Sequence, residues 1–469
     1  MRKKLPEKFT KKIPKETWNI FKKFTDEGFE IYLVGAGVRS LLQDKTPVDC
    51  DFTTNATPKA IQALFEDSFY DNKFGTVGIS LKTKRGEELY EITTYRTEWG
   101  YSDKRRPDEV KWGEKLEEDL KRRDFTWNAI VIGPVLKKGK WDKKTLELID
   151  FFEGQKDFKN KRVKAVGKAE ERFSEDALRM MRAVRFAAQL GLNIEKKTFA
   201  AIKKNAFLID KISQERIRDE LFKILSSDYA ADGYLILRNS SLAKKILPEI
   251  EKMFGVEQKS PGRHHLDDVG THAIKSLKAS KSKDPIVNLA ILIHDVGKPV
   301  VAGKDKKGTI TFYNHEVVGA SIARNIAKRL RFSRKDEKRL VTLVRWHQFS
   351  VDERQTDKAI RRFIKNVGKE NLTEILEVRR ADRVGGGARE TSWRFERFKK
   401  KLVEVQKQPF SVTDLKVNGN DVMKVLNIRS GPMVGKVLNQ LFEEVEEDKK
   451  KNERKYLLKK IKEIGKKLA

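Results

Sequence analysis

Two short stretches decide the fold of the first third of the chain: Leu33-Val34-Gly35-Ala36-Gly37-Val38-Arg39 and Val48-Asp49-Cys50-Asp51-Phe52. The first predicts an apolar strand that runs into a turn of small residues and then into a helix. Backbone N–H groups at such a turn can bind phosphates, and Arg39 would add a positive charge there. The second predicts a strand on which Asp49 and Asp51 share a face, because side chains alternate along strands. Paired carboxylates of this kind can hold Mg²⁺ ions.

The residues beyond these stretches continue an alternation of strand and helix. Residues 77–81 alternate between apolar and polar side chains, and residues 129–132 form an apolar run that Gly133-Pro134 closes. Short runs of this kind, bounded by turn residues, are typical of β-strands. We therefore expect a small α/β domain over residues 1–153.

Helix signals replace strand signals beyond residue 153. Ser174-Glu175-Asp176 predicts the start of a long helix that runs to Leu190-Gly191, because a serine cap and acidic residues favour a helix N-terminus. The expected fold class is an α/β head followed by a mostly α-helical neck, body and tail. The expected bounds are 1–153 for the head, 154–255 for the neck, 256–395 for the body and 396–469 for the tail, with Ser260-Pro261-Gly262 near the neck–body boundary.

The charge of the chain indicates a polyanionic partner. Its 469 residues carry 101 lysines and arginines against 69 aspartates and glutamates, which gives a formal net charge of +32. A surplus of this size is typical of proteins that bind nucleic acid, although a lysine-rich proteome could also produce it.

Other features of the composition bear on the compartment. Cys50 is the single cysteine, which excludes an intrachain disulfide and fits a reducing cytoplasm. No stretch approaches the ~18 consecutive apolar residues of a membrane helix, so we expect no membrane partner. The basic N-terminus lacks the apolar segment of a signal peptide. We therefore expect a cytoplasmic protein.

The spacing of the glycine turn and the two aspartates resembles the nucleotidyltransferase signature of the DNA polymerase β superfamily. Over residues 34–58 the chain resembles the bacterial tRNA nucleotidyltransferase / poly(A) polymerase family, the class II CCA-adding enzymes. Two residues depart from the family pattern. The family's Gly-Gly pair is Gly35-Ala36 here, and Ser40 replaces the aspartate that usually follows the arginine, which removes a support of Arg39.

The resemblance implies roles for the residues of both stretches. It implies that Gly35, Ala36 and Arg39 bind the triphosphate of a nucleotide. It also implies that Asp49 and Asp51 are the catalytic residues, which hold Mg²⁺ while a hydroxyl attacks and pyrophosphate leaves.

Residues 122–129, with the sequence Arg-Arg-Asp-Phe-Thr-Trp-Asn-Ala, are close to the family motif RRDFTxNA. An arginine there can contact phosphates, whereas a carboxylate and an amide can bond a ribose 2′-hydroxyl. The resemblance therefore implies that Arg123, Asp124 and Asn128 position the nucleotide.

Glu175-Asp176-Ala177-Leu178-Arg179 matches the family motif EDxxR. We expect Asp176 and Arg179 on one face of a helix, because positions i and i+3 are neighbours there. A carboxylate accepts from an exocyclic amino group and a guanidinium donates to a ring acceptor, so the pair would select cytosine and adenine.

Each of three neighbouring features allows two interpretations. Glu91 could be a third acid near the metals, although a solvated or paired strand acid is favoured. The segment 98–119 resembles the full-length loop that the family needs for the terminal A, which argues against a CC-only enzyme and leaves CCA-adding and A-adding enzymes open. Arg182 and Arg185 either contact an acceptor stem or form a solvated face.

All six histidines lie between His264 and His347, which predicts a histidine site in the body. His294-Asp295 follows an apolar helical run, and an adjacent pair of this kind can chelate a metal. The order resembles the HD phosphohydrolase superfamily, whose basic pattern is filled by His272, His294, Asp295 and Asp382, with His315 and His347 completing a two-metal version. The resemblance implies a second divalent metal (Mg, Mn, Ni or Fe) and phosphatase or cyclic phosphodiesterase activity, or else a scaffold without turnover.

The sequence therefore predicts an enzyme that adds or repairs the 3′-terminal CCA of tRNA from CTP and ATP. The segment 418–448 resembles the family's tail, which would hold the tRNA elbow. The alternatives are an HD-domain phosphohydrolase acting on nucleotides or RNA ends, a non-enzymatic RNA-binding protein, and, within the same fold, an A-adding enzyme or poly(A) polymerase.

Overall fold

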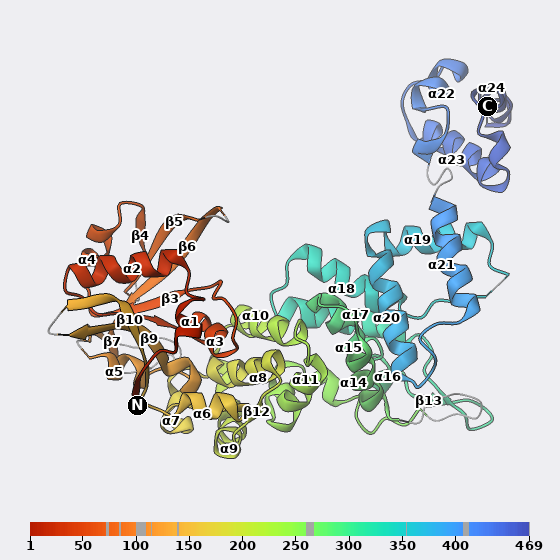
Figure 1. Cartoon of the computed structure of the whole chain (residues 1–469). Coiled ribbons are helices and arrows are strands. Elements are labelled where there is room, and N and C mark those ends of the chain that lie inside the picture. The colour runs from red at the N-terminus through yellow and green to blue at the C-terminus, as the bar shows by residue number, and fades with distance from the viewer. Residues whose placement is uncertain are drawn as a thin grey trace.

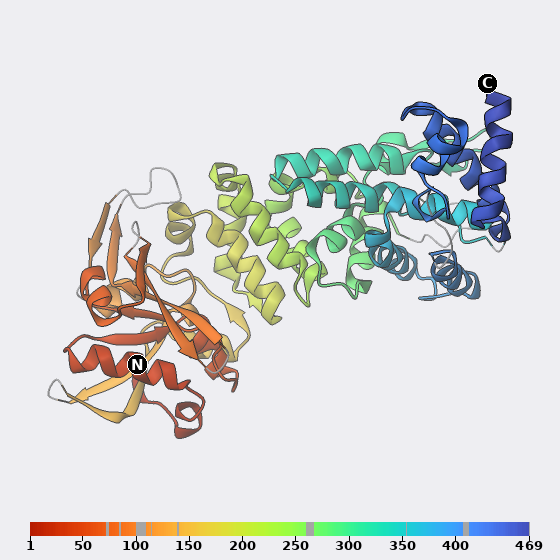
Figure 2. The ribbon, with the colours of Figure 1, turned by 90° about the horizontal axis from the view of Figure 1, so that it is seen from above.

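The computed structural model describes the whole chain apart from residues 72–74, 84–85, 100–108, 114, 138–139, 259–266, 353, 407–411 and 469. The molecule is elongated. Figures 1 and 2 place the head at one end and the tail at the other, with the helical neck and body between them. No helix in the described part of the chain has the length and apolarity that a membrane crossing requires.

The head is built on a mixed eight-stranded sheet of order β1-β10-β9-β2-β3-β6-β5-β4. Its strands are β1 (Arg2–Lys4), β2 (Ile31–Val34), β3 (Asp51–Thr54), β4 (Ser68–Asp71), β5 (Thr76–Thr83), β6 (Gly86–Thr94), β9 (Ile130–Lys137) and β10 (Lys140–Asp150). β3 and β6 run parallel, and the other neighbours are antiparallel. Val34 at the end of β2 pairs with Asp51 at the start of β3, so the two deciding stretches meet at one point.

Aromatic side chains join helix α2 (Lys15–Asp26) to this sheet. Phe21 and Phe24 are fully buried, and the ring of Trp18 stacks on that of Trp141 at 5.7 Å. Burying such rings removes a large apolar area from water and contributes much of the stability of a small sheet domain.

Strand β9 is longer than predicted, because Gly133-Pro134 does not close it. Pro134 pairs with Leu146 of β10 at an irregularity in the register. A Cβ on Gly133 would lie 2.5 Å from the carbonyl oxygen of Ile31. This glycine therefore allows close packing between strands rather than a turn.

The predicted helix over 174–190 is wrong at its start. Helix α7 (Ala169–Glu175) ends where that helix was expected to begin, and α8 (Leu178–Leu190) follows after a break. Asp176 has an extended backbone (φ −134°, ψ 105°), and its carboxylate accepts the N–H of Leu178 at 3.0 Å. The acid thus caps the second helix instead of lying inside one long helix.

The neck and body are helical and share one hydrophobic core with the head. The helices that matter for the sites are α10 (Gln214–Leu225), α14 (Val269–Ala279), α15 (Pro285–Ile293), α16 (Lys298–Val301), α17 (His315–Arg329), α18 (Arg334–Trp346) and α20 (Leu372–Gly385). The expected boundary at residues 260–262 lies outside the described residues.

The tail has a hydrophobic core of its own, formed by α22 (Gly419–Leu426), α23 (Pro432–Glu447) and α24 (Arg454–Leu468). Leu441, Leu457 and Ile461 are fully buried in it. Asn418 starts α22 with a capping box, its side chain accepting backbone N–H groups while Asp421 accepts the N–H of Asn418. Figure 1 shows these helices as a separate cluster above the body.

We predict that Leu441→Ala destabilises the tail by about 2 to 5 kcal/mol, because it leaves a cavity in a small core. Hydrogen exchange should accelerate in residues 412–468 and stay slow in the head sheet. The matched variant Leu221→Ala truncates a buried leucine of the large core. It should accelerate hydrogen exchange in the head sheet and leave exchange in residues 412–468 slow. Equal loss of protection in head and tail on Leu441→Ala would contradict a separate tail core.

Candidate active site and candidate metal centre

The two aspartates of the predicted catalytic pair lie at the start of β3, but only one belongs to the strand. β3 begins at Asp51, and Asp49 lies in an exposed bend before it, so the expected alternation along one strand is wrong for this pair. The glycine turn lies very close to the carboxylate of Asp51. Gly35 has φ +71°, and a Cβ there would lie 3.3 Å from Oδ2 of Asp51. Glycine therefore both permits the turn and leaves room beside the carboxylate.

The surroundings of Asp51 disfavour the ionised form of its carboxylate. Burial and the neighbouring charges of Asp49 and Glu91 raise its pKa to about 6. Glu91 lies beside it because β3 pairs in parallel with β6, with Phe52 opposite Ile92. Three acids therefore gather at the mouth of the glycine turn, and Glu91, although exposed, is near enough for its charge to act on Asp51.

Arg39 lies in α3 (Ala36–Leu42), directly after the turn, and it has a partner in place of the missing family aspartate. Its Nη1 donates to Oδ1 of Asn128 at 2.6 Å. Burial lowers the pKa of Arg39 to about 10, which still leaves the guanidinium charged. The support that Ser40 cannot give is therefore supplied by the motif at residues 122–129.

That motif connects the head to the neck. Asn128 Nδ2 donates to Oδ1 of Asp124 at 2.8 Å, and Arg182 Nε of α8 donates to the other oxygen at 2.8 Å. Burial alone would raise the pKa of Asp124, but the charge of Arg182 and the bond from Asn128 lower it to about 2. Arg182 and Arg185, for which stem contact or solvation was open, are both paired. Arg185 bonds Glu220 at 3.1 Å.

Arg123 is held next to the carboxylates. Its Nη2 lies 3.4 Å from Oδ2 of the fully buried Asp119, which also accepts from Thr53 of β3 at 3.1 Å. The positive charge of Arg123 acts to lower the pKa of Asp51, so the guanidinium and the acids belong to one electrostatic site.

The predicted base-selecting pair lies at the break between α7 and α8. Asp176 Oδ2 accepts from Arg216 Nη2 of α10 at 2.9 Å. Arg179 donates from Nη1 to Glu175 at 2.5 Å and from Nη2 to the carbonyl oxygen of Arg122 at 2.9 Å. The two side chains are therefore fixed by the break and by separate partners, not by a shared helical face. Sequence reasoning missed Arg216, which lies 40 residues downstream with no local signal.

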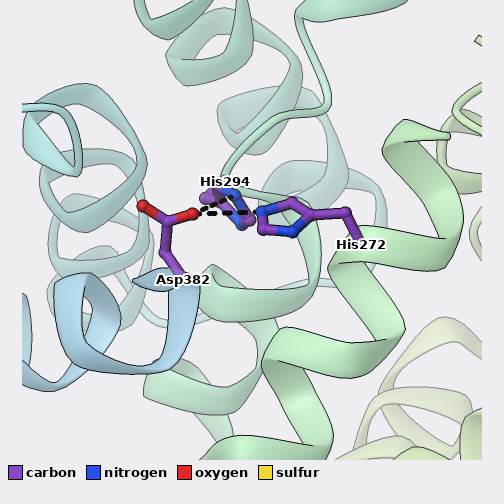
Figure 3. Close-up of side chains that lie close together, drawn as sticks. All are labelled: His272, His294 and Asp382. Atoms are coloured by element: carbon purple, nitrogen blue, oxygen red, sulfur yellow. Dashed lines mark hydrogen bonds and ion pairs between the residues drawn. The ribbon is translucent and has the colours of Figure 1, made fainter. Parts of the chain in front are cut away.

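The candidate metal centre brings together all six residues that the histidine pattern predicts. They come from α14 (His272), the ends of α15 and α18 (His294, Asp295 and His347), the start of α17 (His315) and α20 (Asp382). In one group, Asp382 Oδ1 lies 3.0 Å from His272 Nε2 and 3.6 Å from His294 Nε2, as Figure 3 shows. In the other, Asp295 Oδ1 lies 3.4 Å from His315 Nε2 and 3.7 Å from His347 Nε2.

Backbone carbonyls orient three of the four rings. The Nδ1 atoms of His294, His315 and His347 lie 2.7 to 2.8 Å from carbonyl oxygens three residues earlier. A carbonyl only accepts, so each Nδ1 carries a hydrogen and each Nε2 points its remaining position into the cluster. This arrangement fixes histidines as ligands in metal sites, and imidazole with carboxylate suits several divalent metals.

One histidine of the cluster, His294, must lose a proton before it can bind a metal. Burial disfavours a charged His294, but the carboxylates of Asp295 and Asp382 outweigh it and raise the pKa of this histidine to about 9. A protonated Nε2 cannot bind a metal, so metal binding here must release a proton.

Comparison with known proteins finds three family models that match separate parts of the chain. Residues 31–164 match the poly A polymerase head domain, residues 191–254 match the probable RNA and SrmB-binding site of polymerase A, and residues 309–461 match the putative tRNA nucleotidyltransferase domain 2. The CCA-adding enzyme of Lactobacillus helveticus is 44% identical over 244 residues, which cover 52% of this chain and 56% of that protein. The chain thus spans little more than half the length of the curated relatives it matches.

The solved structures extend the likeness over the full length. The crystal structure of the Bacillus stearothermophilus CCA-adding enzyme in complex with CTP aligns with a TM-score of 0.67 and 25% identity, covering 99% of both chains. The Thermotoga maritima CCA-adding enzyme complexed with tRNA shares the fold, with a TM-score of 0.61, 18% identity and 98% coverage of both.

Together these likenesses support the class II CCA-adding enzyme and poly(A) polymerase family as the family that the chain resembles. The resemblance seen in the sequence is confirmed, and so is the fold class, a mixed α/β head followed by helical regions. None of the three matching family models is described as a metal-binding HD domain, and the His/Asp cluster in the body is seen in the structure itself.

We predict that Asp51→Asn stabilises the metal-free protein at pH 7.5 by about 3 kcal/mol at most, because one pKa unit is worth about 1.4 kcal/mol. The folded pKa of about 6 lies above the ordinary 3.8, so ionised Asp51 opposes folding once the pH exceeds both. The gain should shrink below pH 6 and vanish below pH 4.

Denaturant unfolding with a chelator at pH 7.5 and pH 4 measures this gain. Asp228→Asn is the matched control, since that exposed carboxylate has a lowered pKa beside Lys283 and its loss should not stabilise. A gain for Asp51→Asn that is the same at both pH values would contradict the electrostatic origin.

Proposed function

We propose that the chain adds or restores the 3′-terminal CCA of tRNA, using CTP and ATP. The observation that carries this proposal is the contact between the glycine turn and Asp51, with Asp49, Glu91 and Arg123 gathered around it. A phosphate-binding turn beside clustered acids is the arrangement that nucleotidyl transfer requires. The likeness to this family supports it, and the relatives named above are CCA-adding enzymes.

In this proposal Asp49 and Asp51 hold Mg²⁺, with Glu91 adding negative charge beside them. The bound metal would activate the attacking hydroxyl and stabilise charge on the leaving group. The tRNA 3′-hydroxyl loses its proton and its oxygen forms a bond to the α-phosphorus, the bond from the α-phosphorus to the bridging β-phosphate oxygen breaks, and pyrophosphate leaves carrying that proton. Gly35 and Ala36 offer backbone N–H groups to the triphosphate, and the charges of Arg39 and Arg123 attract it.

In this proposal the hydrogen-bonded side chains at the head–neck junction select the nucleotide. Asp124 and Asn128 bond each other in the free protein, and each keeps capacity for a ribose hydroxyl. Asp176 and Arg179 would read the base edge, the carboxylate accepting and the guanidinium donating. Their partners Arg216 and Glu175 hold them in place meanwhile.

A poly(A) polymerase or an A-adding enzyme would use the same site, and product length separates them. A CCA-adding enzyme extends a tRNA lacking its 3′ end by C, C and A and then stops. The loop residues on which A addition was argued, Tyr101 to Asp108, lie outside the described residues. The single buried cysteine, Cys50, is compatible with the proposed cytoplasmic location.

A second function is favoured by the cluster in the body. We propose that its six residues hold a divalent metal and hydrolyse a phosphate ester. Water would form a bond to phosphorus, the ester P–O bond would break, and the proton of water would pass to the leaving oxygen. The converging Nε2 atoms and the carbonyls that orient the rings support this proposal.

We predict that Asp49→Ala abolishes extension of a tRNA lacking CCA, because the remaining acids cannot hold the metals in place. Radiolabelled CTP and ATP incorporation with Mg²⁺ measures it. Asp295→Ala is the paired variant and should keep extension while losing any metal-dependent phosphate release. Extension that survives Asp49→Ala would contradict the first function.

We predict that Arg179→Lys mainly reduces discrimination between correct and incorrect nucleotides, since lysine keeps the charge but not the planar fork. The ratio of kcat/KM for CTP and ATP over UTP and GTP should fall by about tenfold, the effect of losing one bidentate contact of about 1.4 kcal/mol. Arg172→Lys, which alters the neighbouring arginine bonded to Glu175, is the control and should leave the ratio unchanged. An unchanged ratio for Arg179→Lys would remove this residue from base selection.

A further inference from the structure

We propose that the exposed face of strands β4 to β6, beside the acids of the head, holds the 3′-terminal base of the RNA substrate, with Phe69 as the side chain on which that base stacks. This inference rests on the proposed CCA addition and adds to it the subsite that receives the RNA end. Phe69 contacts the RNA in this subsite and takes no part in binding the nucleoside triphosphate.

One row of residues crosses the sheet from the acids to Phe69. Glu91 of β6 pairs with Gly78 of β5, and Gly78 pairs with Phe69 of β4. Asp51 lies beside Glu91 in the parallel pairing of β3 with β6. Residues opposite each other in a sheet share a face, so the four positions lie on one face. Neighbouring strands are about 4.8 Å apart, which places Gly78 about 10 Å from Asp51 along the row.

The ring of Phe69 extends along this row toward the acids. A Cβ on Gly78 would overlap the Cζ atom of Phe69, so the ring lies above this glycine and a side chain there would displace it. Phe69 is nevertheless 54% exposed, and Leu89, two residues before Glu91 on the same strand, is 55% exposed. Exposed apolar side chains on one face beside an active site indicate contact with a ligand, whereas isolated ones are ordinary.

The hydrophobic core lies on the other face of these strands. Val77 and Ile79 of β5 are fully buried there, where helix α4 (Pro58–Leu64) packs on β4, β5 and β6. Neither Phe69 nor Leu89 packs in a hydrophobic core of the described residues. Their apolar surface is therefore available to a ligand.

The geometry of the proposed reaction places the RNA end on this side of the acids. Gly35 and Arg39 come directly after β2, and Asn128, the partner of Arg39, lies directly before β9. In the sheet, β2 and β9 lie on one side of β3, whereas β6, β5 and β4 lie on the other. The attacking and leaving oxygens of an in-line displacement lie on opposite sides of the phosphorus. Pyrophosphate leaves toward the glycine turn, so the 3′-hydroxyl enters from the side of β6 and brings its base toward Phe69.

The chemistry of the row suits a base rather than a phosphate. From Asp51 to Phe69 it holds two acids, a glycine and a phenylalanine, so it offers a phosphate no cation. Stacking on an aromatic side chain accepts every base, because every base has a π-face. In the proposed reaction the base at the RNA end changes as the end grows, and a contact that tolerates each base meets that requirement.

Steady-state extension by the full-length protein tests this inference. The substrates are two synthetic tRNAs that lack CCA, one with a base on its 3′-terminal nucleotide and one abasic there, both with the 3′-hydroxyl. With wild-type protein, loss of the base should lower kcat/KM for the RNA about tenfold, within the range for one base stacked on an aromatic side chain.

Phe69→Leu keeps an apolar cover over Gly78 but removes the ring. It should lower kcat/KM for the tRNA with the base by a similar factor and leave kcat/KM for the abasic tRNA unchanged, because the two changes remove the same contact and their effects do not add. The KM for CTP should not change. Phe69→Tyr, which keeps an aromatic ring, should retain the wild-type values. Phe207→Leu is the matched control, at a phenylalanine of the neck that is 59% exposed, and should also retain them.

Three outcomes would overturn the inference in distinguishable ways. Wild-type protein that extends neither tRNA overturns the proposed function and this subsite with it. Wild-type protein that extends both tRNAs equally well overturns the stacked base alone. An equal fall for both tRNAs in Phe69→Leu, or no fall for either, shows that the ring does not contact the base, and leaves CCA addition by the head intact.

Discussion

The ion pair between the buried Asp124 and the half-buried Arg182 is the constraint on which the proposed active site depends. It joins the head to the first long neck helix, and through Asn128 it reaches Arg39 behind the glycine turn. The pair tolerates little displacement, because separating it leaves the buried carboxylate of Asp124 without a compensating charge. The orientation of α8, and with it the position of Arg179, is therefore tied to the glycine turn.

Both candidate sites hold like charges together at a cost to the fold. In the head, Asp49 and Glu91 raise the pKa of Asp51, and in the body two carboxylates keep a proton on a buried histidine. Groups perturbed in this way by burial and by specific neighbours are typical of functional sites. In both sites the cations are paired with acids, but in the body Lys298 and Arg379, which pair with Asp295 and Asp382, also line a cavity.

Sequence patterns predicted the parts of the fold that local chemistry determines. The strand at Leu33-Val34, the glycine turn after it and the strand that begins near residue 130 were predicted from residue type and spacing, and the six members of the histidine cluster from the resemblance to a family pattern. The predictions that failed concerned positions whose structure depends on neighbours distant in sequence. Gly133-Pro134 suggested a turn, but Gly133 is a glycine because the backbone of Ile31 lies against it. The serine and acids at 174–176 predicted the start of one long helix. In the structure the carboxylate of Asp176 instead accepts a backbone N–H at the start of α8.

The site residues show the same division. Metal-ligating histidines carry a signal in their order, because few residue types perform that role. Arg216 and Lys298 carry none, since a lysine or arginine in a chain with 101 of them is distinguished only by what it touches. The positions of Asp124 and Arg39 were predicted, but the bond through Asn128 that compensates for Ser40 required the fold.

The separate core of the tail has a consequence for how a long substrate would be handled. A module that has its own core and remains on the same chain would keep any RNA it holds within reach of the head, and this would raise the local concentration of the RNA end there. Such tethering separates affinity from chemistry. In the proposed reaction the tail would supply residence time, and the acids and arginines of the head would need only weak contacts with the RNA 3′ end.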